Sequence, residues 1–298
     1  MSLLRALFFV VLSALAASAA GPDSRLDCSQ LQSHILKRAV RYCALLPASY
    51  DATAGEKPAP AYPVLYYLHG LGDNERSLIN TGAWSLIDSL RQQQVIGDFL
   101  IVTPEGDRSF YINSADGKQP YGDFFLREFM PAIERKYRVK PGRANRAITG
   151  MSMGGFGALR LAFAYPRLFS SVSAQSAALV TGTPQEFNAA LRPGTPLAEM
   201  FGGIFGIPVN MQHWHANDPF LLAQENRAPL ASLAIYFNCG RDDDYGFENG
   251  AAALHQRLKK EGIKHEFHLY AGNHSLTYFL THLPEALAFH SHAFAAAR

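Results

Sequence analysis

Short apolar runs alternate along the chain with longer stretches in which apolar residues recur every three or four positions. The short apolar runs lie at 64–68, 99–102, 146–149 and 233–237. Two further strand-like segments lie at 170–177, which is rich in small residues, and at 265–270. A continuous apolar run of this length is typical of a strand buried on both faces. The longer stretches have helical spacing, at 84–95, 121–137, 155–164, 247–261 and 276–297, and we expect Pro284 to interrupt the last of them. This order predicts an α/β fold with a mostly parallel central sheet and helices on both faces.

Two further segments, 26–33 and 38–46, predict an N-terminal β-hairpin around a short turn. Cys28 and Cys43 lie equally far from the centre of that turn, so antiparallel pairing would place them opposite each other at disulfide range. We therefore expect a Cys28–Cys43 bridge, with two free buried thiols as the alternative. Cys239 lies in an apolar run, where a small buried hydrophobic side chain is expected.

The alternation of strands and helices breaks at 180–215, a stretch rich in glycine and proline. A long segment of this kind between regular elements is often an active-site lid or binding loop. We expect a small cap inserted over the site rather than a second domain, so that 21–298 forms a single domain.

The N-terminal residues 1–20 have the pattern of a secretory signal peptide. Arg5 supplies a short positive region, 6–17 is apolar or uncharged, and 18–20 are small residues suited to cleavage. The alternative is a membrane anchor, but a spanning helix needs about 20 apolar residues and this run is shorter. We expect a secreted or periplasmic protein with no stable membrane insertion after cleavage.

The charge balance argues against a polyanionic partner. The chain has 27 basic and 25 acidic side chains among 298 residues, and no run of lysine or arginine. A nearly neutral surface of this kind does not favour nucleic acid, so we expect none as a partner.

Candidate chemistry is concentrated in the pentapeptide Gly150-Met151-Ser152-Met153-Gly154. A G-x-S-x-G sequence between a strand and a helix is the nucleophile-elbow pattern, in which the serine lies on a sharp turn and the glycines allow strand and helix to approach. The alternative is a glycine-rich turn with an incidental serine. The predicted strand before the motif and helix after it favour a nucleophile.

A serine nucleophile needs an adjacent base, which in this chain order follows the serine and comes after an acid. His274 lies between a predicted strand and a predicted helix, whereas the other late histidines lie within strands or helices. The acid should follow the strand at 233–237, where Asp242, Asp243 and Asp244 stand in a row. The residues alone do not distinguish among these three.

The oxyanion hole needs two backbone N–H groups that converge on the developing negative charge. One is expected from Met153, the residue after the nucleophile. The other is expected from the glycine-rich segment 69–72, which follows the first buried strand, and we choose Leu71 as its donor.

These motifs resemble those of the serine esterases of the esterase D group, which includes S-formylglutathione hydrolases, feruloyl esterases and mycobacterial mycolyltransferases. The similar segments span almost all of the chain after the leader and lie at 67–72, 103–111, 129–139, 150–155 and 272–275. In this family the pattern Cys239-Gly240-x-x-Asp243 carries the acid. The resemblance therefore implies Asp243, with Asp242 and Asp244 as alternatives.

The resemblance implies an α/β-hydrolase fold and a serine carboxylesterase that acts on acetyl, short acyl or feruloyl esters. It implies catalytic residues Ser152, Asp243 and His274, a small-molecule or carbohydrate-linked ester substrate, and no metal or cofactor. The leader disfavours the cytosolic activity of S-formylglutathione hydrolases. Two alternatives stay open: an acyltransferase to a sugar or alcohol acceptor, and a catalytically silent hydrolase fold used for binding.

Overall fold

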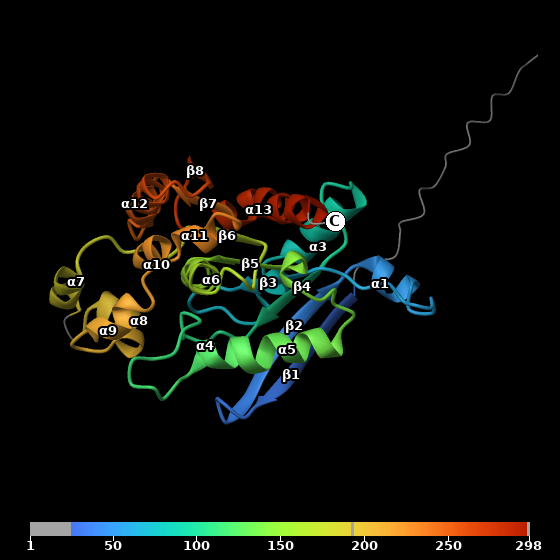
Figure 1. The fold of residues 1–298 in the computed structure, drawn as a ribbon, viewed down its shortest axis with the longest axis horizontal. Coiled ribbons are helices and arrows are strands. Elements are labelled where there is room, and N and C mark those ends of the chain that lie inside the picture. The colour runs from blue at the N-terminus through green and yellow to red at the C-terminus, as the bar shows by residue number, and fades with distance from the viewer. Residues whose placement is uncertain (1–24, 192–193, 297–298) are drawn as a thin grey trace, which may run out of the picture.

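A single eight-stranded sheet forms the centre of the molecule (Figure 1). The computed structural model describes residues 25–191 and 194–296, and the predicted leader at 1–20 lies outside the described residues. The strand order is β1-β2-β4-β3-β5-β6-β7-β8. Strands β3 to β8 pair in parallel, and β1 and β2 pair antiparallel at one edge. The predicted mostly parallel sheet with an N-terminal hairpin is confirmed.

The inner strands are buried along nearly their whole length, as expected for strands covered on both faces. They are β3 (Val64–Leu68), β4 (Leu100–Pro104), β5 (Arg146–Met151), β6 (Ser171–Gln175) and β7 (Ala234–Gly240). The edge strands β1 (Arg25–Ser33) and β8 (Glu266–Tyr270) alternate between exposed and covered positions instead. Exposure on one face is expected at the edge of a sheet, where fewer helices cover it.

The hairpin of β1 and β2 (Arg38–Leu46) pairs in the predicted register. Cys28 lies opposite Cys43, and a disulfide joins them with a Cα–Cα distance of 4.0 Å. Cys239 is free and fully buried in β7. Both predictions about the cysteines are confirmed.

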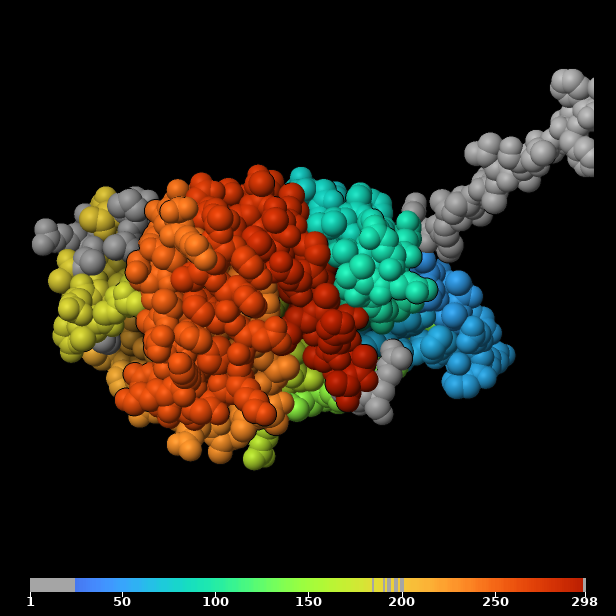
Figure 2. Space-filling model, turned by 90° about the horizontal axis from the view of Figure 1, so that it is seen from above, coloured from blue at the N-terminus to red at the C-terminus, as the bar shows by residue number. Residues whose placement is uncertain are grey.

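Helices cover both faces of the sheet (Figure 1). One face packs against α2 (Ser77–Asn80), α3 (Ala83–Gln92) and α13 (Leu276–Ala296). The other packs against α4 (Tyr121–Phe124), a π-helical turn (Phe125–Phe129), α5 (Met130–Lys136), α6 (Met153–Ala164) and α12 (Phe247–Lys260). Two short helical segments, α1 (Ala48–Ala52) and a 3₁₀ turn (Arg143–Asn145), lie in connections. In the view of Figure 2, the C-terminal elements fill the middle of the surface.

The predicted interruption of the last helix at Pro284 is wrong, because α13 continues through it. Proline removes one backbone hydrogen bond from a helix interior. Leu283 and Leu287, on either side of it, are buried against the sheet. That packing holds the helix together across the lost bond.

In the part of the chain between β6 and β7 that the structure describes, five helices lie in and beyond the segment predicted as a cap. They are α7 (Pro184–Ala190), α8 (Pro196–Phe205), α9 (Met211–His215), α10 (Pro219–Glu225) and α11 (Arg227–Leu230). Helices α7 to α9 form one end of the molecule (Figure 1). Their aromatic side chains pack on one another: the Phe187 and Trp214 rings are 4.7 Å apart and the Phe205 and Trp214 rings 4.9 Å. Over the described residues, no helix is long and apolar enough to cross a bilayer.

Candidate active site

Ser152 lies on a sharp turn between β5 and α6. Its backbone has φ 53° and ψ −119°, a left-handed conformation that is strained for a residue with a side chain. A Cβ on Gly150 would collide with the backbone of Gly154, and one on Gly154 would collide with the carbonyl of Leu68. The turn therefore requires both glycines of the motif, for the reason that the sequence pattern predicts.

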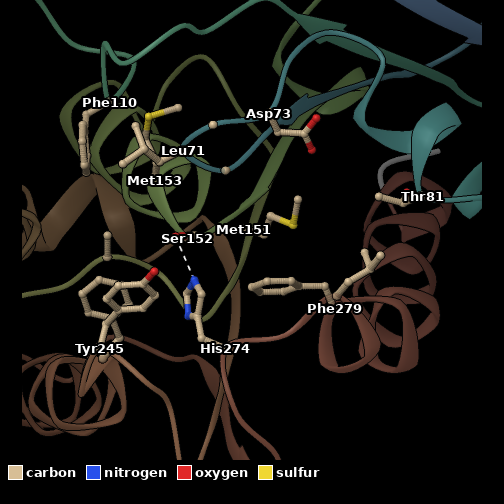
Figure 3. A pocket seen from close by; sticks show the side chains of 15 residues that line it. Leu71, Asp73, Thr81, Phe110, Met151, Ser152, Met153, Tyr245, His274 and Phe279 are labelled. Atoms are coloured by element: carbon tan, nitrogen blue, oxygen red, sulfur yellow. Dashed lines mark hydrogen bonds between the residues drawn. The ribbon is translucent and has the colours of Figure 1, made fainter. Parts of the chain in front are cut away.

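The structure brings Ser152 together with His274, as Figure 3 shows, and His274 together with Asp243. His274 Nε2 is 3.0 Å from Ser152 Oγ, and His274 Nδ1 is 2.7 Å from Asp243 Oδ2. His274 lies in the loop between β8 and α13, and Asp243 follows β7. All three are therefore at the carboxyl ends of parallel strands, where ligands bind in sheets of this kind.

Burial and hydrogen bonds set the protonation state of Asp243. Its side chain is fully buried, and burial raises the pKa of a carboxyl group. The hydrogen bond and charge of His274 and the Tyr245 N–H, 3.1 Å from Oδ1, act in the opposite direction, and the pKa of Asp243 ends below its usual value. Asp243 is thus a carboxylate that can hold the His274 ring and stabilise an imidazolium.

The neighbouring aspartates do not reach the imidazole of His274. Asp242 is exposed. Asp244 is exposed as well, and its Oδ2 accepts a hydrogen bond of 3.1 Å from the backbone N–H of His274. This contact holds the histidine loop, a role that sequence reasoning missed because it joins residues 30 positions apart.

Leu71 and Met153 both line the cavity above Ser152 (Figure 3). Met153 is the first residue of α6, so its N–H is among those at the helix N-terminus that have no partner within the helix. Leu71 follows β3 on a loop next to the elbow, since a Cβ on Gly70 would lie 3.6 Å from Ser152 Cβ. Both predicted donors are thus on segments adjacent to the serine.

A buried network holds the loop that carries Leu71. His69 Nδ1 donates to the Gly70 carbonyl and Nε2 accepts from the Gly106 N–H, both at 2.8 Å. Burial lowers the pKa of His69, which keeps the ring neutral and suits this donor and acceptor pattern. The Tyr111 hydroxyl donates to the His69 carbonyl at 3.1 Å. Sequence reasoning missed this role of Tyr111. The only indication in the sequence was that an aromatic residue follows the predicted strand at 99–102.

Phe110 and Tyr111 are consecutive residues with positive φ, 51° and 59°. Such backbone angles cost free energy in residues with side chains and cluster at functional sites. They turn Phe110 into the cavity and Tyr111 beneath the loop of His69.

The cavity at Ser152 has a volume of about 320 Å³ and is mostly apolar. Its apolar side chains include Leu71, Phe110, Met151, Met153, Phe247, Leu276 and Phe279. Of the described residues that line it, none comes from 180–215. The cap instead packs beside the site, where the Phe201 ring is 4.9 Å from the ring of Phe110. The described part of the predicted cap thus contacts the side chain of Phe110 from outside the cavity.

Within the described parts of the chain, no group of three or more histidine, cysteine or acidic side chains is arranged to hold a metal ion.

Comparison with known proteins gives one family and several relatives. The model of the Esterase family, described as "Putative esterase", matches residues 33–290. An acetyl esterase of Caldicellulosiruptor saccharolyticus is 27% identical over 260 residues, which are 85% of this chain and 93% of that protein. An endo-1,4-beta-xylanase/feruloyl esterase of Xylanibacter ruminicola is 33% identical over 128 residues, 42% of this chain and 18% of that protein.

Solved structures share the fold over most of the chain. A ferulic acid esterase superposes with a TM-score of 0.75 at 26% identity, covering 91% of this chain and 99% of that one. An S-formylglutathione hydrolase from Staphylococcus aureus superposes with a TM-score of 0.71 at 19% identity, covering 89% and 98%. The predicted α/β-hydrolase architecture is confirmed by these neighbours.

Proposed function

The chain belongs to the Esterase family and is a carboxylic ester hydrolase, and from this premise we propose that Ser152, His274 and Asp243 form its catalytic triad. The observation that carries the proposal is the pair of hydrogen bonds from Ser152 through His274 to Asp243, 3.0 and 2.7 Å. These distances are within the reach that proton transfer between nucleophile and base requires.

The proposed reaction has two steps. Ser152 Oγ attacks the ester carbonyl carbon while His274 Nε2 takes its proton and then gives it to the leaving alcohol. The N–H groups of Leu71 and Met153 stabilise the negative charge on the carbonyl oxygen. Water, activated by His274, then attacks the acyl-enzyme, and the acid leaves as Ser152 recovers its proton.

The substrate we propose is an ester with an acetyl, short acyl or feruloyl group. An acetyl esterase and feruloyl esterases are among the relatives and neighbours, and the mostly apolar cavity suits the hydrocarbon part of such an acyl group. We also propose that the protein is secreted or periplasmic. The leader pattern at 1–20 supports this, as does the Cys28–Cys43 disulfide, since disulfides persist in oxidising compartments.

Replacement of the nucleophile tests the proposed triad. We expect Ser152→Ala to lower kcat on 4-nitrophenyl acetate by at least about 10⁴-fold, because the serine and its base act as a unit. The matched control is Ser85→Ala, since Ser85 is exposed on α3 and is not among the residues that line the cavity. A fluorophosphonate probe should label the wild type and S85A but not S152A. Retained hydrolysis by S152A would refute the proposal.

A further inference from the structure

The cavity at Ser152 has two chemically different sides (Figure 3). Leu71, Phe110 and Met153 lie together on one side of the serine. Asp73 and Thr81 lie on the other, together with the apolar side chains of Met151 and Phe279. Among the described residues that line the cavity, Asp73 is the only acidic one, and none is a lysine or an arginine.

Asp73 is held on the loop that also carries Leu71. Its N–H donates to the Gly70 carbonyl at 3.3 Å, and its Oδ1 accepts the Asn74 N–H at 2.8 Å. The side chain is half-buried. No cationic side chain of the described residues forms an ion pair with it. The carboxylate therefore presents an uncompensated negative charge to the cavity.

Thr81 adds a hydroxyl group to the same side. Its Oγ1 donates to the Ser77 carbonyl at 2.7 Å, which leaves the oxygen lone pairs as acceptors. A carboxylate and a threonine oxygen whose proton is already donated both accept hydrogen bonds. A ligand that satisfies them must bring donors, as the hydroxyl groups of a polyol or sugar do.

We propose that Asp73 and Thr81 select the alcohol part of the ester: they accept hydrogen bonds from a neutral, hydroxyl-bearing alcohol and exclude an anionic one. The apolar side around Phe110 and Met153 then takes the acyl group. This inference rests on the proposed function, because it assigns the two sides of the cavity relative to the Ser152 nucleophile. It makes carbohydrate or glycerol esters favoured substrates and the net anionic thioesters of glutathione poor ones.

The test compares substrates that differ only in charge. One pair is 4-acetoxybenzoate, which is anionic, and 4-acetoxybenzamide, which is neutral. The other is acetylcholine, which is cationic, and its neutral isostere 3,3-dimethylbutyl acetate. For each pair the measured quantity is the ratio of kcat/KM values, so that a general loss of activity cancels.

We expect Asp73→Asn to raise the anionic-to-neutral ratio about tenfold and to lower the cationic-to-neutral ratio by a similar factor. Asparagine can still accept the Asn74 N–H, so the turn is kept. Asp73→Glu retains the charge and should shift neither ratio by more than about twofold. Asp107→Asn is the matched control, because Asp107 is exposed and not among the cavity residues, and it should leave both ratios as in the wild type.

Hydroxyl recognition has its own measurement. On a monoacetylated methyl glycoside, D73N and Thr81→Val should each raise KM by about ten times the factor seen on ethyl acetate. D73N replaces the carboxylate oxygen that does not bind Asn74 by an NH₂ group, and Thr81→Val removes the threonine oxygen, whereas the ethyl group of ethyl acetate has no hydroxyl to bind either acceptor. Charge ratios and KM values that do not change in D73N would overturn the inference. The D73N measurements test the inference and not the triad. Retained activity in S152A would instead overturn the proposed triad.

Discussion

The three consecutive aspartates after β7 differ in burial and in what they bind. Asp243 is buried and contacts the imidazole of His274, whereas Asp242 is exposed and Asp244 binds only the His274 backbone. A carboxylate orients a catalytic imidazole only through a direct hydrogen bond to its ring. At the scale of single residues, the proposed triad thus uses the one of three identical side chains that points inward.

Single replacements of these aspartates by asparagine should separate their roles. We expect D243N to lower kcat on 4-nitrophenyl acetate by about 10³- to 10⁴-fold, since an amide stabilises neither the tautomer nor the imidazolium of His274. D244N should cost less than about tenfold, because an amide oxygen can still accept the His274 N–H. D242N, the control, should have wild-type kcat. Three equal small losses would refute the assignment of Asp243.

At the scale of elements, the site depends on how closely α6 crosses β3. The two elements meet where Gly154, in the first turn of α6, faces the carbonyl of Leu68 at the end of β3. Leu68 also pairs with Gly150 in the sheet register, so strand, turn and helix are fixed relative to one another at this point. The position of Ser152 follows from this contact.

Addition of one methyl group where α6 crosses β3 should therefore destabilise the folded protein. We expect Gly154→Ala to lower the free energy of unfolding by at least about 2 kcal/mol, because backbone on both sides must move. In Gly203→Ala, the control in α8, the new methyl group meets no atom within 4 Å. It should be neutral or stabilising by up to about 1 kcal/mol, since alanine favours a helix. Urea unfolding measures both, and equal effects would contradict the crossing argument.

At the scale of the whole molecule, a buried histidine joins the last helix to the centre of the sheet. His290 of α13 is fully buried, and its Nδ1 and Nε2 are each 2.8 Å from a serine Oγ of β6, Ser171 and Ser173. Burial lowers the pKa of His290 to about 3. The folded protein thus keeps this ring neutral at pH values where an unfolded chain would protonate it.

This difference predicts acid sensitivity with a definite sign. Below about pH 6.5 the unfolded state binds a proton at His290 that the folded state does not bind until about pH 3, so stability falls as pH falls between these values. The expected slope is about 1.4 kcal/mol per pH unit. His290→Gln should remove this contribution from urea unfolding curves measured between pH 7 and 4. His292→Gln changes an exposed position on the same helix and should leave this contribution unchanged. Equal slopes of unfolding free energy against pH in the wild type, H290Q and H292Q would contradict the prediction.

Local patterns in the sequence predicted features that depend on short stretches of chain. The elbow around Ser152, the hairpin that pairs Cys28 with Cys43 and the buried strands follow from residue spacing, because backbone geometry over a few residues is set by side-chain size and apolar pattern. The order of serine, acid and histidine along the chain indicated an esterase, because each of these residues follows a strand that the apolar pattern predicted.

The tertiary structure decided what depends on contacts between distant segments. The hydrogen bond between His274 and Asp243 and the one from Tyr111 to the His69 carbonyl each join residues from separate elements, and the cavity places Asp73 near Ser152 in the same way. The path of α13 through Pro284 was decided in the same way, by packing against the sheet. These contacts arise from how whole helices and strands pack, and no pattern within one segment contains that information.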